Sequence, residues 1–395
     1  MLYSKKYFLL TGLLFALLFQ GCKKEPESPI IPLEDFFKNP KQTNFQLSPN
    51  GEKISFLQPY KNRMNLFVCN FDSSDIVRIT SDTLRDIDSY FWSGSNRLVY
   101  LQDTDGDENY KLIAVNIDGS GTVNLTPFER TKVYVIDDLP DNDDEMIIAM
   151  NRRNPSIFDA YKINVNTGEL TLLMQNPGNI TSWFTDNKGV LRLATSSNGL
   201  TTDLLYRDNA SEPFRKIMSY NFRDEFEPAF FTEDNKNIYA LSNIGRDKIA
   251  AVEFDPVQAK EIKTVYENSE VDVSKLVKSE KNNKLIVAVY STWKKQFHYF
   301  DDNAAGLLKE IENKLPAYES IIAGNDRNED RFIIRTFSDK SLGAFYSFDS
   351  KSKTLKKLSD VSPWLNENNM ADMKPISFQA RDRTYRAVPS ASSAD

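Results

Sequence analysis

A β-strand signal recurs seven times along this chain. Each repeat opens with a polar turn and continues into a short apolar run, as in SPNGEKISFL at 48–57. One apolar residue in each repeat serves to align it with the others. These residues are Ile54, Leu98, Met146, Val190, Ile238, Leu285 and Phe332, and successive ones lie 44 to 48 residues apart. Turn residues such as Asp, Asn, Gly and Ser separate the runs, because they tolerate tight or left-handed backbone.

Every repeat also holds a second hairpin, such as NLFVCNFDSSDIVRIT at 65–80. Two hairpins in about 45 residues are typical of one four-stranded propeller blade. The sequence therefore predicts an all-β, seven-bladed β-propeller with four-stranded blades over 44–358. No helical period is expected inside the array, so KQFHYFDDNAAGLLKEI at 295–311 is interpreted as a hairpin. The segment PLEDFFKNP at 32–40 is expected to form a short turn or helix before the first blade.

The first residues are typical of an export signal. Lys5 and Lys6 precede a short apolar run, and Gly21-Cys22 lies just after it. This run, Phe8 to Phe19, is 12 residues long and interrupted only by Thr11 and Gly12. It is too short for a membrane-spanning helix, which needs about 20 residues. We expect a signal peptide over 1–21 and lipidation of Cys22. The polar residues 22–43 then form a lipid-attached tether and lead-in. The expected location is the outer membrane of a bacterium, on its periplasmic face or at the cell surface. The alternative to a lipoprotein signal is an ordinary signal peptide in which Cys22 occurs by chance.

Composition excludes several kinds of site. The 395 residues contain 49 basic and 56 acidic side chains, a net charge of −7, which disfavours nucleic acid as a partner. The chain has one histidine, His298, and two cysteines, Cys22 and Cys69. A histidine-cluster metal site, a zinc finger and a disulfide framework are therefore not expected, and neither is a cofactor. Cys69 is interpreted as a small buried side chain.

Three segments resemble one family. FQLSPNGEKISF at 45–56 and YLQDTDGDENYKL at 100–112 resemble the first and second blades of the prolyl oligopeptidase and acylaminoacyl-peptidase family of serine peptidases. KPISFQARD at 374–382 resembles the strand through which that family's chain leaves the propeller. The resemblance spans about 31–382. It implies a propeller that screens peptides beside an α/β-hydrolase domain with a serine, an aspartate and a histidine.

The sequence departs from that family in one respect. It contains no G-x-S-x-G nucleophile motif, and only 13 residues follow Asp382. We interpret 359–382 as an exit segment towards a hydrolase domain that the chain lacks, and 383–395 as an aberrant tail from a frameshift or premature end. The expected function is a substrate-gating propeller that is inactive alone, with no catalytic residue. The alternative is a stand-alone propeller lipoprotein that binds peptide, protein or glycan.

Other polar and aromatic clusters are given structural roles. His298 lies among aromatic residues in a strand-like run and is expected to be structural. The segment Asp103–Asn109 lacks the spacing of an EF-hand and is interpreted as a turn in which carboxylates cap backbone N–H groups. The acidic segment 137–145 is expected to be a solvated loop between blades. Arg152, Arg153 and the segment 223–227 could face the channel or the hydrolase side, and the four tryptophans are expected to pack in the core or between blades: Trp92, Trp183, Trp293 and Trp364.

Overall fold

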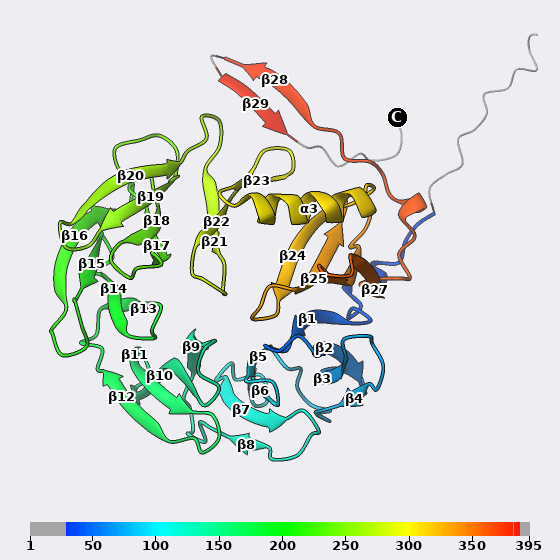
Figure 1. Ribbon diagram of the computed structural model, residues 1–395, viewed down its shortest axis with the longest axis horizontal. Coiled ribbons are helices and arrows are strands. Elements are labelled where there is room, and N and C mark those ends of the chain that lie inside the picture. The colour runs from blue at the N-terminus through cyan, green and yellow to red at the C-terminus, as the bar shows by residue number, and fades with distance from the viewer. Residues whose placement is uncertain (1–28, 382, 388–395) are drawn as a thin grey trace, which may run out of the picture.

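The strands form a closed ring of seven sheets in a computed structural model that describes residues 29–381 and 383–387 (Figure 1). The seven-bladed propeller expected from the repeats is confirmed. The expected signal peptide 1–21 and Cys22 lie outside the described residues. No helix within 29–381 or 383–387 combines the length and apolar character needed to cross a membrane.

The blades follow one another along the chain, and the strands of each blade run in sequence order from the axis outward (Figure 1). Blade 1 contains β1 (Thr43–Leu47), β2 (Lys53–Tyr60), β3 (Arg63–Asn70) and β4 (Val77–Arg78). Blade 2 contains β5 (Ser89–Ser93), β6 (Arg97–Gln102), β7 (Lys111–Asn116) and β8 (Val123–Asn124). Blade 3 contains β9 (Val133–Asp137), β10 (Glu145–Asn154), β11 (Ile157–Asn164) and β12 (Leu170–Met174). Blade 4 contains β13 (Ile180–Thr185), β14 (Leu191–Ser197), β15 (Thr201–Tyr206) and β16 (Arg215–Asn221).

The remaining blades complete the ring. Blade 5 contains β17 (Phe226–Phe231), β18 (Ile238–Ser242), β19 (Ala250–Asp255) and β20 (Lys260–Tyr266). Blade 6 contains β21 (Val273–Lys278), β22 (Leu285–Ser291) and β23 (Lys295–Tyr299), followed by helix α3 (Asp302–Lys314). Blade 7 contains β24 (Glu319–Asn325), β25 (Arg331–Phe337), β26 (Ala344–Asp349) and β27 (Thr354–Asp360). Helix α2 (Leu33–Phe37) precedes the ring, as expected, and the 3-10 turn η1 (Glu367–Asn369) and the hairpin β28 (Ile376–Ala380)–β29 (Arg383–Ala387) follow it.

Helix α3 corrects the expected hairpin at 295–311. Blade 6 has three strands, and α3 follows β23 at the point in the chain where the other blades have their fourth strand, but it packs against blade 7. Asp301 caps the helix by accepting a hydrogen bond from the Ala304 backbone N–H at 2.9 Å. The buried side chains Leu308 and Ile311 lie one helical turn apart, and the latter packs against blade 7. The run from Ala304 is rich in good helix formers, a signal that the strand-based interpretation overlooked.

Within the described residues the core consists of seven apolar clusters, six of them between neighbouring blades and the seventh between α3 and blade 7. Both faces of a blade are therefore buried, and strands such as β2 show runs of buried residues instead of strict alternation. Like every other pair of neighbours, blades 7 and 1 share no strand, so the ring is closed by side-chain packing together with backbone hydrogen bonds from Lys41 to Val361 (3.1 Å) and from Arg327 to Pro49 (2.9 Å). The rings of Phe45 and Phe345, each about 5% exposed, lie 4.8 Å apart at this junction.

Similar turns join the first and second strands of several blades. Ser48 Oγ accepts from the Lys53 N–H at 3.0 Å, and Asp326 Oδ1 accepts from the Arg331 N–H at 2.8 Å. In blade 4 the corresponding bond, from the Val190 N–H to Asp186 Oδ1, is also 3.0 Å long but closes a turn one residue shorter. The fully equivalent apolar residue of blade 4 is thus Leu191, and the alignment on Val190 is wrong by one residue.

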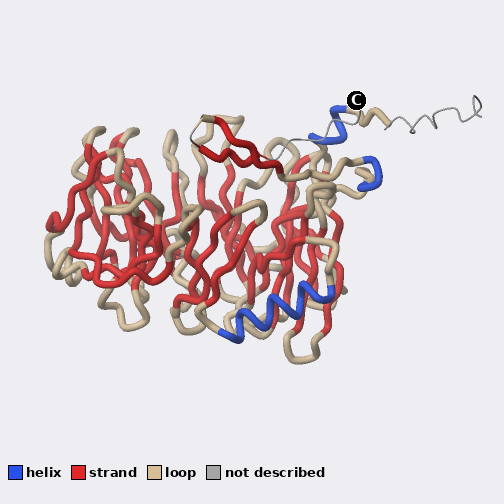
Figure 2. Tube along the Cα trace, turned by 90° about the horizontal axis from the view of Figure 1, so that it is seen from above, coloured by secondary structure: helices blue, strands red, loops and turns tan. Residues whose placement is uncertain are grey.

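The two faces of the disc differ. Four antiparallel strands return the chain to the face from which it started, so the chain joins and leaves the propeller on one face, which we call the terminal face. Figure 2 shows β28–β29 above this face and α3 on the opposite side. The opposite face carries the turns between the first and second strands of all seven blades, and we call it the turn face.

Candidate functional site

The turns on the turn face form a continuous ring. Neighbouring turns are joined at all seven junctions by hydrogen bonds or an ion pair. These are Asn50–Ser95, Ser93–Asp143, Thr185–Asp137, Asn187–Asn235, Lys284–Glu233, Ser279–Glu329 and Arg327–Pro49. The ring holds polar side chains from distant parts of the sequence around the mouth of the central channel.

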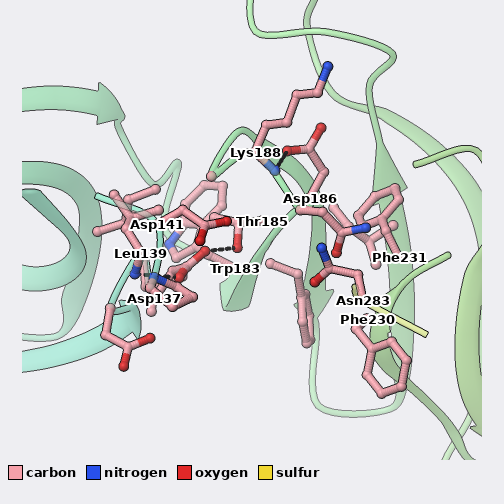
Figure 3. Close-up of a pocket in the computed structure, with 18 of the residues that line it drawn as sticks. Asp137, Leu139, Asp141, Trp183, Thr185, Asp186, Lys188, Phe230, Phe231 and Asn283 are labelled. Carbon is pink, nitrogen blue, oxygen red and sulfur yellow. Dashed lines mark hydrogen bonds between the residues drawn. The ribbon is translucent and has the colours of Figure 1, made fainter. Parts of the chain in front are cut away.

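A cavity of about 710 Å³ opens within this mouth, lined by blades 3, 4, 5 and 6. Figure 3 shows Asp137 and Asp141 on one side of it, with Phe230 and Asn283 on the other. Apolar side chains contribute to the wall, including Leu139 and the buried Trp183. A cavity of this size with mixed lining suits a ligand of a few residues.

Unbalanced negative charge characterises the cavity. Asp138 is accessible to solvent but lies inside the cavity, where the surrounding protein displaces much of the bulk water. This desolvation, followed by repulsion from Asp137, raises the pKa of Asp138. Desolvation also raises the pKa of Glu280, with repulsion from Asp138 and Glu329 added. Lys278 opposes both shifts, without forming an ion pair with either carboxylate.

The expectation that the acidic segment 137–145 connects two blades is wrong. This segment is the turn between β9 and β10 within blade 3, and part of it lines the cavity. Sequence reasoning did not identify the cavity partners Lys278 and Glu280. Their only local signal is a charged pair at the end of an inner strand, which is common on solvated turns.

The terminal face is different in chemistry. Trp364, beyond the last blade, donates from Nε1 to the Asp35 carbonyl at 2.8 Å and so joins the exit segment to α2. Exposed apolar side chains occur on each of these two segments and on β28: Ile30, Leu33, Phe36, Phe37, Met373, Ile376 and Phe378. Single exposed apolar residues are normal, but these add apolar area to the segments through which the chain joins and leaves the propeller.

The segment Asp103–Asn109 forms a turn between β6 and β7, as expected. Asp107 Oδ1 accepts from the Asn109 N–H at 3.0 Å, and Asp103 accepts from the Glu108 N–H at 3.2 Å. Arg85 also donates a bidentate pair of hydrogen bonds to Asp103, from Nε to Oδ1 at 2.7 Å and from Nη2 to Oδ2 at 2.9 Å. The carboxylates thus order the turn. Within the described residues, no group of three or more His, Cys, Asp or Glu side chains is placed to hold a metal ion.

The other residues named from the sequence, Cys69, His298 and Arg153, have structural roles. Cys69 is 4% exposed in β3, as expected, and burial raises the pKa of its thiol to about 11. The His298 ring is half-buried and stacks on Tyr266 with 4.0 Å between ring centres. Arg153 pairs with the buried Asp159 at 2.9 Å near the end of β10.

Arg152, which precedes Arg153 in the chain, lies over the Phe128 ring. Arg223 lies in the loop before β17. Trp183 is buried between blades 3 and 4, as expected. The expectation for Trp293 is wrong, because this side chain is 39% exposed in the turn between β22 and β23.

Comparison with known proteins supports the family resemblance. The chain is 26% identical over 398 aligned positions to dipeptidyl aminopeptidase BIII of Pseudoxanthomonas mexicana, covering 96% of this chain and 57% of that protein. It is 22% identical to dipeptidyl peptidase family member 6 of Caenorhabditis elegans, covering 91% and 52%. No family model matches the chain. The chain spans about half the length of these curated relatives.

Solved structures give the same result for the fold. Prolyl oligopeptidase B from Galerina marginata, with a 35mer substrate bound, superposes with a TM-score of 0.62 at 12% identity, covering 89% of this chain and 55% of that one. A prolyl endopeptidase superposes with a TM-score of 0.61 and similar coverage. The resemblance is confirmed: the chain matches the N-terminal β-propeller of the prolyl oligopeptidase family.

Proposed function

We propose that this propeller admits and orients peptide substrates for an exported serine peptidase of the prolyl oligopeptidase type. The observation that carries the proposal is the match over nearly the whole chain to the propeller half of dipeptidyl aminopeptidase BIII and of prolyl oligopeptidase B. The chain supplies the channel and its mouth. A nucleophile, a catalytic histidine and an oxyanion hole are to be supplied by a hydrolase part outside the 395 residues.

The residues of this chain are consistent with a binding role without catalysis. It contains no G-x-S-x-G motif, and its single histidine, in blade 6, stacks on Tyr266 of blade 5. The apolar group on the terminal face, around α2 and β28, is placed where the chain joins and leaves the propeller. A surface of that kind suits contact with a second domain.

Peptidase assays test this proposal. The purified chain is expected to show no serine-dependent hydrolysis of chromogenic dipeptidyl substrates. A chimera in which the hydrolase half of dipeptidyl aminopeptidase BIII follows residue 381 is expected to hydrolyse them. Turnover by the chain alone that a serine-directed inhibitor abolishes would disprove the division of labour. A folded but inactive chimera whose hydrolase half retains esterase activity would argue against the gating role.

Export and anchoring form part of the same proposal. The positive start, the short apolar run and Cys22 support lipidation of Cys22 and attachment to the outer membrane. Labelling cells with an alkyne fatty acid tests this step. The wild-type chain is expected to incorporate the label and to fractionate with membranes, whereas Cys22→Ser is expected to do neither. A Cys69→Ser control should label normally.

A second candidate is a stand-alone lipoprotein propeller that binds peptides without any hydrolase. The cavity favours it, because its mixed apolar and acidic lining exists without a contribution from a second domain. The chimera separates the two candidates: a stand-alone binder is expected to gain no size-selective peptidase activity from an attached hydrolase half.

A further inference from the structure

We infer that the turn-face cavity recognises basic peptide segments, with a lysine or arginine side chain held near Asp138 and Glu280 and its apolar neighbours packed against Leu139 and Phe230. The binding step stands on this chain alone. That such binding selects substrates rests on the proposed function.

The shape and lining of the cavity suit a short peptide. Its volume of about 710 Å³ is sufficient for a short peptide segment. Leu139 and Phe230 are half-buried and present apolar surface to it from blades 3 and 5. A strongly hydrated metal ion would make no use of such surface, whereas a peptide would bury it.

Several charged side chains in the cavity wall are already paired. Asp137 accepts from Thr185 Oγ1, and Glu145 pairs with Lys162 at 2.9 Å. Asp186 caps its own turn and lies 3.4 Å from Arg192. These carboxylates are structural and have little capacity left for a ligand.

Three other carboxylates of the wall are available: Asp138, Asp141 and Glu280. Within the described part of the chain, none of their side chains forms an ion pair or a hydrogen bond with another residue, and Asp138 has a hydrogen bond only with its own backbone N–H. Two lysines of the described wall have no ion-pair partner, Lys188 and Lys278, and the Lys278 Nζ donates to Asn283 at 2.9 Å and reaches Asn187 at 3.5 Å. The wall as a whole contains six carboxylates and three lysines, the third being Lys162. The mouth therefore carries uncompensated negative charge.

This charge makes a cationic ligand favourable. The raised pKa values of Asp138 and Glu280 show that their charged forms are destabilised where they stand. A guanidinium or ammonium group between them would relieve this repulsion and form charge-assisted hydrogen bonds. An anionic or neutral peptide would gain neither.

Calorimetric titration of the purified chain tests the inference. The probes are acetyl-Leu-Arg-Phe-amide and the same peptide with citrulline, which is neutral and nearly the same shape, in place of arginine. We expect the arginine peptide to bind at least about tenfold more tightly at pH 7.5 in low salt, since a charge-assisted hydrogen bond contributes about this much. Equal affinity for the two peptides, or no binding of either, would overturn the inference.

Matched variants locate the site. The double variant Asp138→Asn/Glu280→Gln is expected to lose the preference for arginine while keeping the wild-type circular dichroism spectrum. The control Glu34→Gln/Asp247→Asn removes the same charge from two exposed side chains outside the cavity lining and is expected to keep it. Arginine preference that persists in the cavity variant would place binding elsewhere and overturn the inference.

The titration also separates this inference from the proposed function. It uses no hydrolase, so an active chimera with no arginine preference in binding would reject the cavity site alone. Binding with the expected preference, together with a chimera that fails to gate peptides, would reject the peptidase role and leave the cavity site standing.

Discussion

Arg327 of blade 7 reaches Asp143 of blade 3, with Nη2 and Oδ1 3.1 Å apart, although these blades are not neighbours in the ring. The same Nη2 donates to the Pro140 carbonyl, while the Arg327 backbone N–H donates to Pro49 of blade 1 at 2.9 Å. One residue thus connects three turns across part of the channel mouth. Both side chains of the ion pair are about half-exposed, so its contribution to stability is small, about 0–1 kcal/mol.

Removing this connection should loosen the mouth without unfolding the ring. Arg327→Gln is expected to lower the free energy of unfolding by less than about 1 kcal/mol. Hydrogen exchange in the turn 138–144 should become faster, because the Pro140 carbonyl and Asp143 lose their partner. Exchange in the turn 186–190, which Arg327 does not contact, is the internal control. Unchanged exchange in 138–144 would show that the connection does not restrain the mouth.

Gly343 should be among the glycines least tolerant of substitution. Its φ is +70°, and a Cβ there would lie 2.0 Å from the Thr336 carbonyl oxygen. Gly343→Ala is expected to destabilise the protein by about 2–4 kcal/mol, since both the left-handed backbone and a backbone clash are unfavourable. Gly245, with φ +73° and open space around it, is the matched control. Gly245→Ala should cost only about 1 kcal/mol in urea unfolding; equal costs would argue against the clash.

Side-chain packing between Phe45 and Phe345 should carry much of the ring closure. Phe345→Ala is expected to cost about 3–5 kcal/mol, because it leaves a cavity at a junction that no shared strand holds together. Ile322→Ala in the same blade serves as the control, since Ile322 is 37% exposed and should lose well under 2 kcal/mol. Chemical denaturation measures both. A loss below about 1 kcal/mol for Phe345→Ala would contradict the packing argument.

The Cys69 thiol should be unreactive in the folded protein. Burial raises its pKa from 9.0 to about 11, so the thiolate is disfavoured in the fold. In a Cys22→Ser background at pH 8, we expect no reaction with Ellman's reagent until denaturant is added. The folded state holds the proton more tightly than the unfolded state, so this group's contribution to stability is complete below pH 9 and is lost as the pH rises through 11. Rapid labelling of the native protein at pH 8 would be inconsistent with this burial.

Local signals were enough to predict the ring but not its irregular blade. Polar turns and short apolar runs reflect hydrogen bonds and packing within a blade, so their recurrence predicts seven similar units. The helix α3 was missed because an expectation of four strands per blade outweighed an N-cap at Asp301 followed by good helix formers. The alignment on Val190 is wrong by one residue because the Asp186 turn is one residue shorter than the others. Repeat spacings that already vary from 44 to 48 residues do not reveal a difference of one residue.

The sequence by itself determined the repeat, the burial of both faces of each blade and the family resemblance, because these depend on residues close together along the chain. Only the tertiary structure decided which charges meet. Asp138 and Glu280 lie in different blades and come together because seven wedge-shaped sheets close into a ring of one particular size. Arg327 reaches Asp143 for the same reason. The curvature of the ring is the sum of seven packing interfaces, and no single segment of the sequence specifies it.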